Sequence, residues 1–260
     1  MKKFFVCGFA ALLSFQSFAN LLVNPTRVEL DNLKNRSAVF TLMNRSENTA
    51  RYNIYFEDKE MLDSGEFISL DNDRALFSLS DYVRYSPRRL NIEPEQAVKV
   101  RLAARLPKSI EKGEYRSYIV FHQIPLAPVK SETDADASEP FSLSISAYLK
   151  VSVPVILRVG ELDTNLRILD TNIDAGQHAI QVTIGRDGER SSYGDVEIVD
   201  AATGRIVGGS KNVAIYTELE QRTFSVPITE QLAANTQLIV RYTENDKLNK
   251  AKTVEVGIAL

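Results

Sequence analysis

Apolar and polar residues alternate with a period of two along most of this 260-residue chain. The pattern is clear in residues 37–43 (SAVFTLM), 97–102 (AVKVRL) and 237–242 (QLIVRY). Because successive side chains of a strand point to opposite faces, these segments predict strands with one buried face. Clusters of turn-forming residues separate the segments, as at residues 44–48 and 185–188. This spacing is typical of a β-sandwich or barrel, and helical periodicity is scarce.

The N-terminal segment has the layout of a secretory signal peptide. Lys2 and Lys3 form a positive start, residues 4–15 are mostly apolar, and Ala19 is a small residue suited to cleavage. The apolar run is too short to cross a bilayer comfortably, which disfavours the alternative of a membrane anchor. We therefore expect residues 1–19 to be a cleaved signal and the mature chain to have no stable membrane insertion.

Cysteine use and length indicate how the mature chain is organised. Cleavage would remove Cys7, which is the only cysteine, so no disulfide could support the fold. A chain of this length can form two domains that are stabilised by burial alone. We expect a first β domain over residues 20–157 and a second β-sandwich domain over residues 158–260.

The composition argues against several classes of function. The net charge is −3, which disfavours nucleic acid or an anionic membrane as the main partner. The two histidines, His122 and His178, belong to no catalytic or metal-binding motif, and no Gly-rich phosphate loop is present. The carboxylates Asp134 and Asp136 lie in a loop-like acidic segment without further ligands nearby. We therefore predict a protein that is not an enzyme and that holds no cofactor or metal.

Residues 141–155 (FSLSISAYLKVSVPV) carry the longest alternation in the chain. They follow an acidic segment rich in Pro, Ala and Ser, and they predict an unusually long strand with one apolar face. Pro154 lacks an N–H group and favours an edge position. A long apolar edge strand is normally avoided unless it pairs with another chain, and the alternative is an ordinary strand packed on its own core. The candidate partner-binding residues are Phe141, Leu143, Ile145, Ala147 and Leu149.

Four stretches, in order, resemble the PapD-like family of periplasmic pilus chaperones. Residues 21–30 contain the pair Thr26-Arg27, and residues 85–94 form a Pro-containing strand and turn before a strand that ends in Arg101. Residues 113–121 contain Glu-Tyr-Arg, and the loop before the alternating strand completes the set. Residues 154–159 replace the family's aromatic-Arg-Pro ending, so the resemblance is to a divergent branch.

The resemblance implies an all-β fold of two immunoglobulin-like sandwiches and a chaperone function in the periplasm. Such a chaperone binds and stabilises pilus or fimbrial subunits by donor-strand complementation, and it delivers them to an outer-membrane usher. The five apolar residues named above would form the donor strand. Arg27 and Lys150 would anchor the C-terminal carboxylate of the subunit. The resemblance also leaves open that two copies associate through the donor strand.

Other interpretations of these residues remain open at the level of sequence. Without the resemblance, Arg27 is most simply a solvated strand residue, and Lys150 has a similar alternative. The second half of the chain matches no motif of the family. An alternative function is therefore a structural or adhesive immunoglobulin-like module of a surface appendage. A sugar-binding sandwich is disfavoured, because the chain has no tryptophan to form an aromatic platform.

Overall fold

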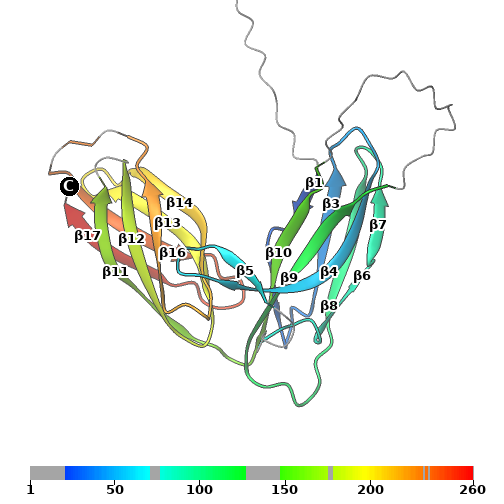
Figure 1. Cartoon of the computed structure of the whole chain (residues 1–260). Coiled ribbons are helices and arrows are strands. Elements are labelled where there is room, and N and C mark those ends of the chain that lie inside the picture. The colour runs from blue at the N-terminus through cyan, green and yellow to red at the C-terminus, as the bar shows by residue number, and fades with distance from the viewer. Residues whose placement is uncertain are drawn as a thin grey trace, which may run out of the picture.

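The computed structural model describes residues 21–70, 77–126, 147–174, 178–230, 232–233 and 235–259. These residues form seventeen strands in two β-sandwiches, which lie at an angle to each other (Figure 1). The predicted all-β fold is confirmed. Within the described residues, no helix has the length and apolar character needed to cross a membrane. The predicted signal peptide at residues 1–19 lies outside the described residues.

The first sandwich contains a four-stranded and a six-stranded sheet. The strand order in the smaller sheet is β1 (Leu21–Asn24), β3 (Ser37–Asn44), β8 (Ala97–Ala104) and β6 (Val83–Ser86). In the larger sheet it is β2 (Val28–Asp31), β10 (Lys150–Val159), β9 (Gly113–Ile124), β4 (Ala50–Met61) and β5 (Phe67–Leu70), and β7 (Arg89–Ile92) also pairs with β4. Strand β1 belongs to the smaller sheet and β2 to the larger one, so the chain passes from one sheet to the other between them. Strand β2 then pairs in parallel with β10.

The second sandwich contains a three-stranded and a four-stranded sheet. The order in the first of these is β11 (Thr164–Asp174), β12 (Ala179–Gly188) and β15 (Gln221–Pro227). The order in the second is β14 (Ile206–Ile215), β13 (Ser192–Asp200), β16 (Gln237–Glu244) and β17 (Thr253–Ala259). Gly160 has a φ of +83° between β10 and β11, a conformation that glycine adopts at little cost.

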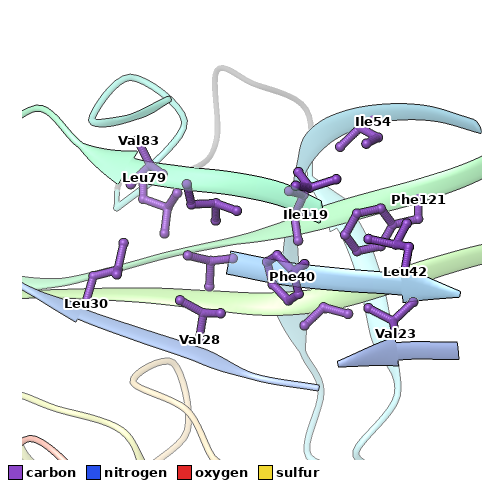
Figure 2. Close-up of a cluster of buried hydrophobic side chains, with 14 of the residues drawn as sticks. Val23, Val28, Leu30, Phe40, Leu42, Ile54, Leu79, Val83, Ile119 and Phe121 are labelled. Carbon is purple, nitrogen blue, oxygen red and sulfur yellow. The ribbon is translucent and has the colours of Figure 1, made fainter. Parts of the chain in front are cut away.

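Each sandwich has its own hydrophobic core, as the alternating pattern predicts. In the first, Phe40 and Phe121 are fully buried and their rings meet edge to face with centroids 5.5 Å apart (Figure 2). In the second, Val182, Val240 and Tyr242 are fully buried. Burial of each such side chain contributes about 1.5–3 kcal/mol. The division between residues 157 and 158 stays a prediction, because β10 continues to Val159, whose side chain belongs to the first core.

Two residues of the larger first-domain sheet pack into the second core. Ile156 of β10 and Met61 at the end of β4 are buried among side chains of the second sandwich. Met61 also donates its backbone N–H to Glu218 Oε1, 2.8 Å away. The β4–β5 hairpin therefore reaches from the first sandwich to the second, and β5 lies between them in Figure 1.

Candidate functional site

Of the long strand expected over residues 141–155, the structure describes residues 147–155. Strand β10 begins at Lys150, and residues 147–149 are exposed and belong to no strand. Phe141, Leu143 and Ile145 lie outside the described residues. Ala147 and Leu149 are described, and Leu149 is exposed although it accepts a hydrogen bond from the backbone of Gln123.

The first half of β10 has an open edge. Along one side the whole strand pairs with β9, from Lys150 opposite His122 to Val159 opposite Gly113. On the other side β2 pairs only with Val155 to Arg158. Among the described residues no strand covers the edge of Lys150 to Pro154. Pro154 lacks an N–H group and lies immediately before the point where β2 begins to pair, as its edge preference predicts.

Arg27 is held at the junction of the two sandwiches. It precedes β2 on the face that points toward the second sandwich, and its side chain is only 9% exposed. Its Nε lies 2.9 Å from Glu29 Oε1, and its guanidinium stacks 4.3 Å from the Tyr193 ring centroid. Burial acts to lower the pKa of Arg27, but Tyr216 and Glu29 together raise it above its ordinary value. Arg27 therefore remains a fixed positive charge, and its Nη2 atom is buried without a hydrogen-bond partner.

Lys150 shares that face of the sheet but lies some distance from Arg27. The pairing of Val28 with Val155 places Arg27 beside Pro154, and Lys150 is four residues earlier, about 13 Å along the strand. Lys150 Nζ contacts Glu57 at 3.0 Å, and this hydrogen bond raises the pKa of Lys150. Its side chain is 42% exposed. The structure therefore places both predicted anchors on one face without bringing them into contact.

Arg27 lines a pocket between the sandwiches with a volume of about 380 Å³. Ser152 and Pro154 of β10 form one wall, and the β4–β5 hairpin contributes Met61, Gly65 and Phe67. The second sandwich contributes Tyr193, Asn212, Ala214, Tyr216 and Arg222. The pocket is therefore built by both sandwiches from segments that are distant in the sequence.

Several groups in this pocket were not predicted from the sequence. Arg222 and Tyr118 line it, and Arg222 Nε and the Tyr118 hydroxyl are buried without a hydrogen-bond partner. Phe67 packs edge to face on Tyr118, with ring centroids 5.5 Å apart. Arg222 lies in β15 between the exposed residues Gln221 and Thr223, so the local sequence does not mark it as a residue of a pocket. Tyr118 directly precedes the apolar residues 119–121, so the local sequence predicts a core residue and does not mark it as part of a pocket.

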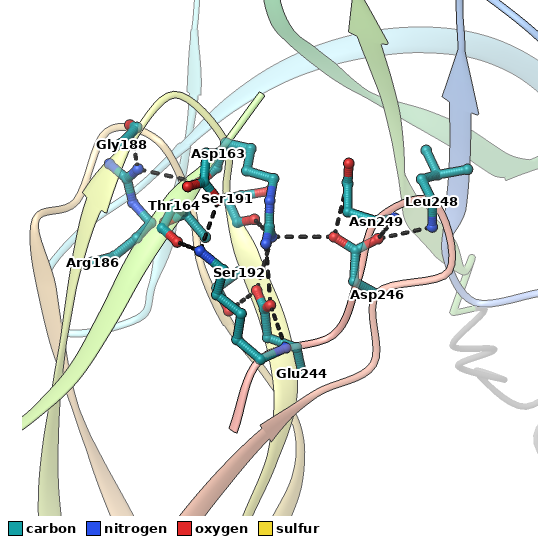
Figure 3. A network of polar contacts seen from close by, with 12 residues as sticks. Asp163, Thr164, Arg186, Gly188, Ser191, Ser192, Glu244, Asp246, Leu248 and Asn249 are labelled. Carbon is teal, nitrogen blue, oxygen red and sulfur yellow. Dashed lines mark hydrogen bonds and ion pairs between the residues drawn. The ribbon is translucent and has the colours of Figure 1, made fainter. Parts of the chain in front are cut away.

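A second cluster of buried charges joins the sandwiches elsewhere, and Figure 3 shows the part of it around Glu244 and Asp246. Arg158 of β10 contacts Glu114 at 3.0 Å and Asp246 at 2.9 Å. Arg190 contacts Glu244 at 2.8 Å and Asp246 at 3.1 Å. All five side chains are at most 5% exposed. We call these residues the ionic network; every guanidinium in it faces a carboxylate.

Asp246 of the ionic network is held in its charged form. Burial acts to raise the pKa of Asp246, but Arg158 and the backbone N–H groups of Leu248 and Asn249 lower it below its ordinary value. Ser192 donates a hydrogen bond to Glu244 Oε1 over 2.8 Å. The network thus pairs each arginine with carboxylates at the junction of the sandwiches, while Arg190 Nε and Glu114 Oε1 are buried without a hydrogen-bond partner.

Comparison with known proteins identifies the fold. No protein-family model matches the chain, and no curated protein matches it either. A chain of the CsuC–CsuE chaperone–tip adhesion subunit complex from the archaic chaperone-usher Csu pili of Acinetobacter baumannii is 11% identical, with a TM-score of 0.50 over 91% of this chain and 98% of that one. The YadV chaperone is 10% identical, with a TM-score of 0.49 over 93% and 100%.

The chain has the fold of a pilus chaperone. The match to the Csu complex spans both sandwiches, so it accounts for the second domain, which carried no recognisable motif. A chain from the Salmonella enterica SafA pilin–SafB chaperone complex is also similar, at 10% identity and a TM-score of 0.49 over 94% and 97% of the two chains. At these identities the likeness establishes the fold. What the protein binds must be argued from its own residues.

Proposed function

We propose that this protein is a periplasmic chaperone that binds pilus or fimbrial subunits by donor-strand complementation and delivers them to an outer-membrane usher. The observation that carries the proposal is the open edge of Lys150 to Pro154, which ends beside the buried Arg27. A partner strand added to this edge would gain backbone hydrogen bonds, each contributing about 0.5–1.5 kcal/mol.

The apolar residues ahead of β10 extend this surface. Leu149 is 40% exposed, and in the proposal Phe141, Leu143, Ile145 and Ala147 continue the same alternating face into the subunit. An incomplete subunit sandwich would cover these side chains, which otherwise favour aggregation. Two free copies of the chaperone could cover the same residues by pairing with each other.

Arg27 and Lys150 are the proposed anchors of the subunit's C-terminal carboxylate. Arg27 has a buried nitrogen available for a charge-assisted hydrogen bond, whereas Lys150 is already paired with Glu57. We therefore expect Arg27 to contribute more than Lys150. The alternative function, a structural or adhesive module, requires neither residue.

Co-expression in the periplasm with candidate pilus subunits, followed by a pull-down on the subunit, tests the proposal. We expect a one-to-one complex whose dissociation constant rises at least about tenfold in Arg27→Ala, with a smaller rise in Lys150→Ala. Lys108→Ala alters an exposed lysine outside the pocket lining and serves as the control. Full binding by Arg27→Ala would favour the alternative module.

A further inference from the structure

One face of the first sandwich carries cations and no carboxylate. It is the outer face of the smaller sheet, formed by the residues of β1, β3, β8 and β6 that point away from the core. Its charged residues are Lys99 and Arg101 of β8 and Arg84 of β6, and the exposed Arg105 continues the alternation of β8 just beyond its end. The other outward positions of the four strands hold uncharged residues. We call this surface the basic face.

The cations of the basic face lie close together without a counter-charge. Lys99 precedes Arg101 by two residues on the same face of β8, and Arg84 lies diagonal to Arg101 on the neighbouring strand. None of these side chains forms an ion pair within the described residues, and neither Asp81 before β6 nor Glu95 before β8 reaches them. Like charges on neighbouring strands repel each other, so an anionic partner would relieve a repulsion that the fold leaves in place.

Apolar side chains adjoin these cations on the same face. Val39 of β3 lies directly opposite Arg101 and is 44% exposed. Leu22 of β1 is 49% exposed and lies opposite Met43, which in turn lies opposite Ala97. The basic face is therefore cationic toward β8 and β6 and apolar toward β1 and β3. Cations beside exposed apolar side chains are the combination with which peripheral proteins bind the headgroup region of anionic membranes.

The basic face points away from the second sandwich. The larger sheet contributes Tyr118, Ser152 and Pro154 to the pocket between the sandwiches, so the smaller sheet lies on the far side of the first core. Charge is distributed unevenly in the same sense, because residues 160–260 contain fifteen acidic and ten basic residues. The net charge of −3 disfavours an anionic membrane as the main partner of the whole chain, but it does not describe this face, whose charged residues are all cations.

We propose that the basic face binds the surface of a bilayer that contains anionic phospholipids. A sheet face presents its side chains in roughly one plane, so the cations reach a planar surface together while Val39 and Leu22 enter its headgroup region. Binding of this kind is peripheral and reversible and requires no membrane-spanning segment. The inference goes beyond the proposed function and does not depend on it. A chain bound in this way keeps the open edge of β10 free, because that edge belongs to the other sheet.

Vesicle flotation with the chain of residues 20–260 tests the inference. One set of vesicles contains phosphatidylcholine alone, and the other contains an equal mixture of phosphatidylcholine and phosphatidylglycerol. We expect binding to the mixed vesicles to be at least about tenfold tighter, because each cation near an anionic surface strengthens binding about fivefold. Raising the ionic strength from about 0.1 M to about 1 M should remove most of this difference, because the Debye length falls from about 10 Å to about 3 Å.

Paired variants identify the face that is responsible. Lys99→Gln combined with Arg101→Gln should weaken binding to the mixed vesicles at least about tenfold. The control, Arg167→Gln combined with Lys211→Gln, removes the same charge from exposed positions of the second sandwich and should weaken binding less than about threefold. All four residues are exposed, so the fold should tolerate both pairs. Val39→Ser should weaken binding by a smaller factor that does not depend on salt, because its contribution is apolar.

Several outcomes would overturn the inference. Equal binding to neutral and mixed vesicles, no binding to either, or equal losses in the two paired variants would each do so. Binding of soluble polyglutamate that requires Lys99 and Arg101, without binding to the mixed vesicles, would assign the basic face to an acidic protein. Failure of the proposed chaperone function would leave the inference standing, because vesicle binding is measured without a subunit.

Discussion

Two of the charged places at which the sandwiches meet differ in whether each arginine has a carboxylate partner. In the ionic network, each buried guanidinium lies against at least one carboxylate, as Arg158 does against Glu114 and Asp246. In the pocket beside β10, Arg222 has no carboxylate partner among the described residues, and Arg27 keeps one buried nitrogen unpartnered. A cluster in which each arginine has a carboxylate partner contributes to the relative placement of the sandwiches, whereas an arginine without one is suited to an anionic ligand.

The largest effect should come from removing one partner within the ionic network. Arg190→Ala leaves the buried carboxylate of Glu244, whose side chain is 0% exposed, without its cation. We expect the free energy of unfolding to fall by about 3–5 kcal/mol, measured by denaturant titration. Arg205→Ala breaks an ion pair whose arginine is 63% exposed and should cost at most about 1 kcal/mol. Equal effects of the two variants would show that the ionic network does not stabilise the fold.

A somewhat smaller loss of stability is expected for Met61, which packs between the sandwiches beside the pocket. Met61 is 4% exposed and inserts into the second core, so Met61→Ala should lower the free energy of unfolding by about 2–5 kcal/mol. Its neighbour Leu62 is 38% exposed, and Leu62→Ala should change stability little. If both variants behave alike in thermal unfolding, the hairpin does not dock on the second sandwich as described.

These contacts show which parts of the molecule could be predicted from sequence. Residues 37–43, 97–102 and 237–242 form strands as their alternation predicts, because burial of one face depends only on local spacing. The partners of a buried charge depend on the tertiary fold: Arg27 and Tyr216 are 189 positions apart, and Arg190 and Glu244 are 54 apart. No local pattern could therefore reveal the ionic network or the pocket.

The start of β10 shows a related limit. Alternation predicted one strand over residues 141–155, but a strand also needs a neighbour to accept its hydrogen bonds. In the structure β9 ends at Ile124, and pairing between β9 and β10 begins with His122 opposite Lys150. Residues 147 and 148 accordingly lie beyond the paired region, and Leu149 at its margin accepts one backbone hydrogen bond from Gln123. The proposed donor role of this segment stays a prediction that a subunit complex would test.

Acidification should reduce the stability that Asp246 contributes through the ionic network. The pKa of Asp246 is lowered in the folded protein, mainly by Arg158 acting against the effect of burial. A lowered carboxyl pKa contributes stability that is present above about pH 4, the ordinary value for aspartate, and is lost as the pH falls below it. Denaturant titrations from neutral to acidic pH should show this decline. Asp246→Asn should be less stable at neutral pH and show a shallower decline, and an unchanged slope would contradict the role of Asp246.

The smallest effect on stability is expected at Arg222, and the size of this effect separates the two charged places most clearly. Arg222→Met removes a half-buried charge that has no carboxylate partner among the described residues, which favours the folded state, but it also loses the hydrogen bond to Ala214. These terms oppose each other, so the free energy of unfolding should change by less than about 1 kcal/mol in either direction. A loss close to that of Arg190→Ala would make Arg222 a structural residue. A small change would mean that Arg222, unlike Arg190, is not retained for the stability of the fold.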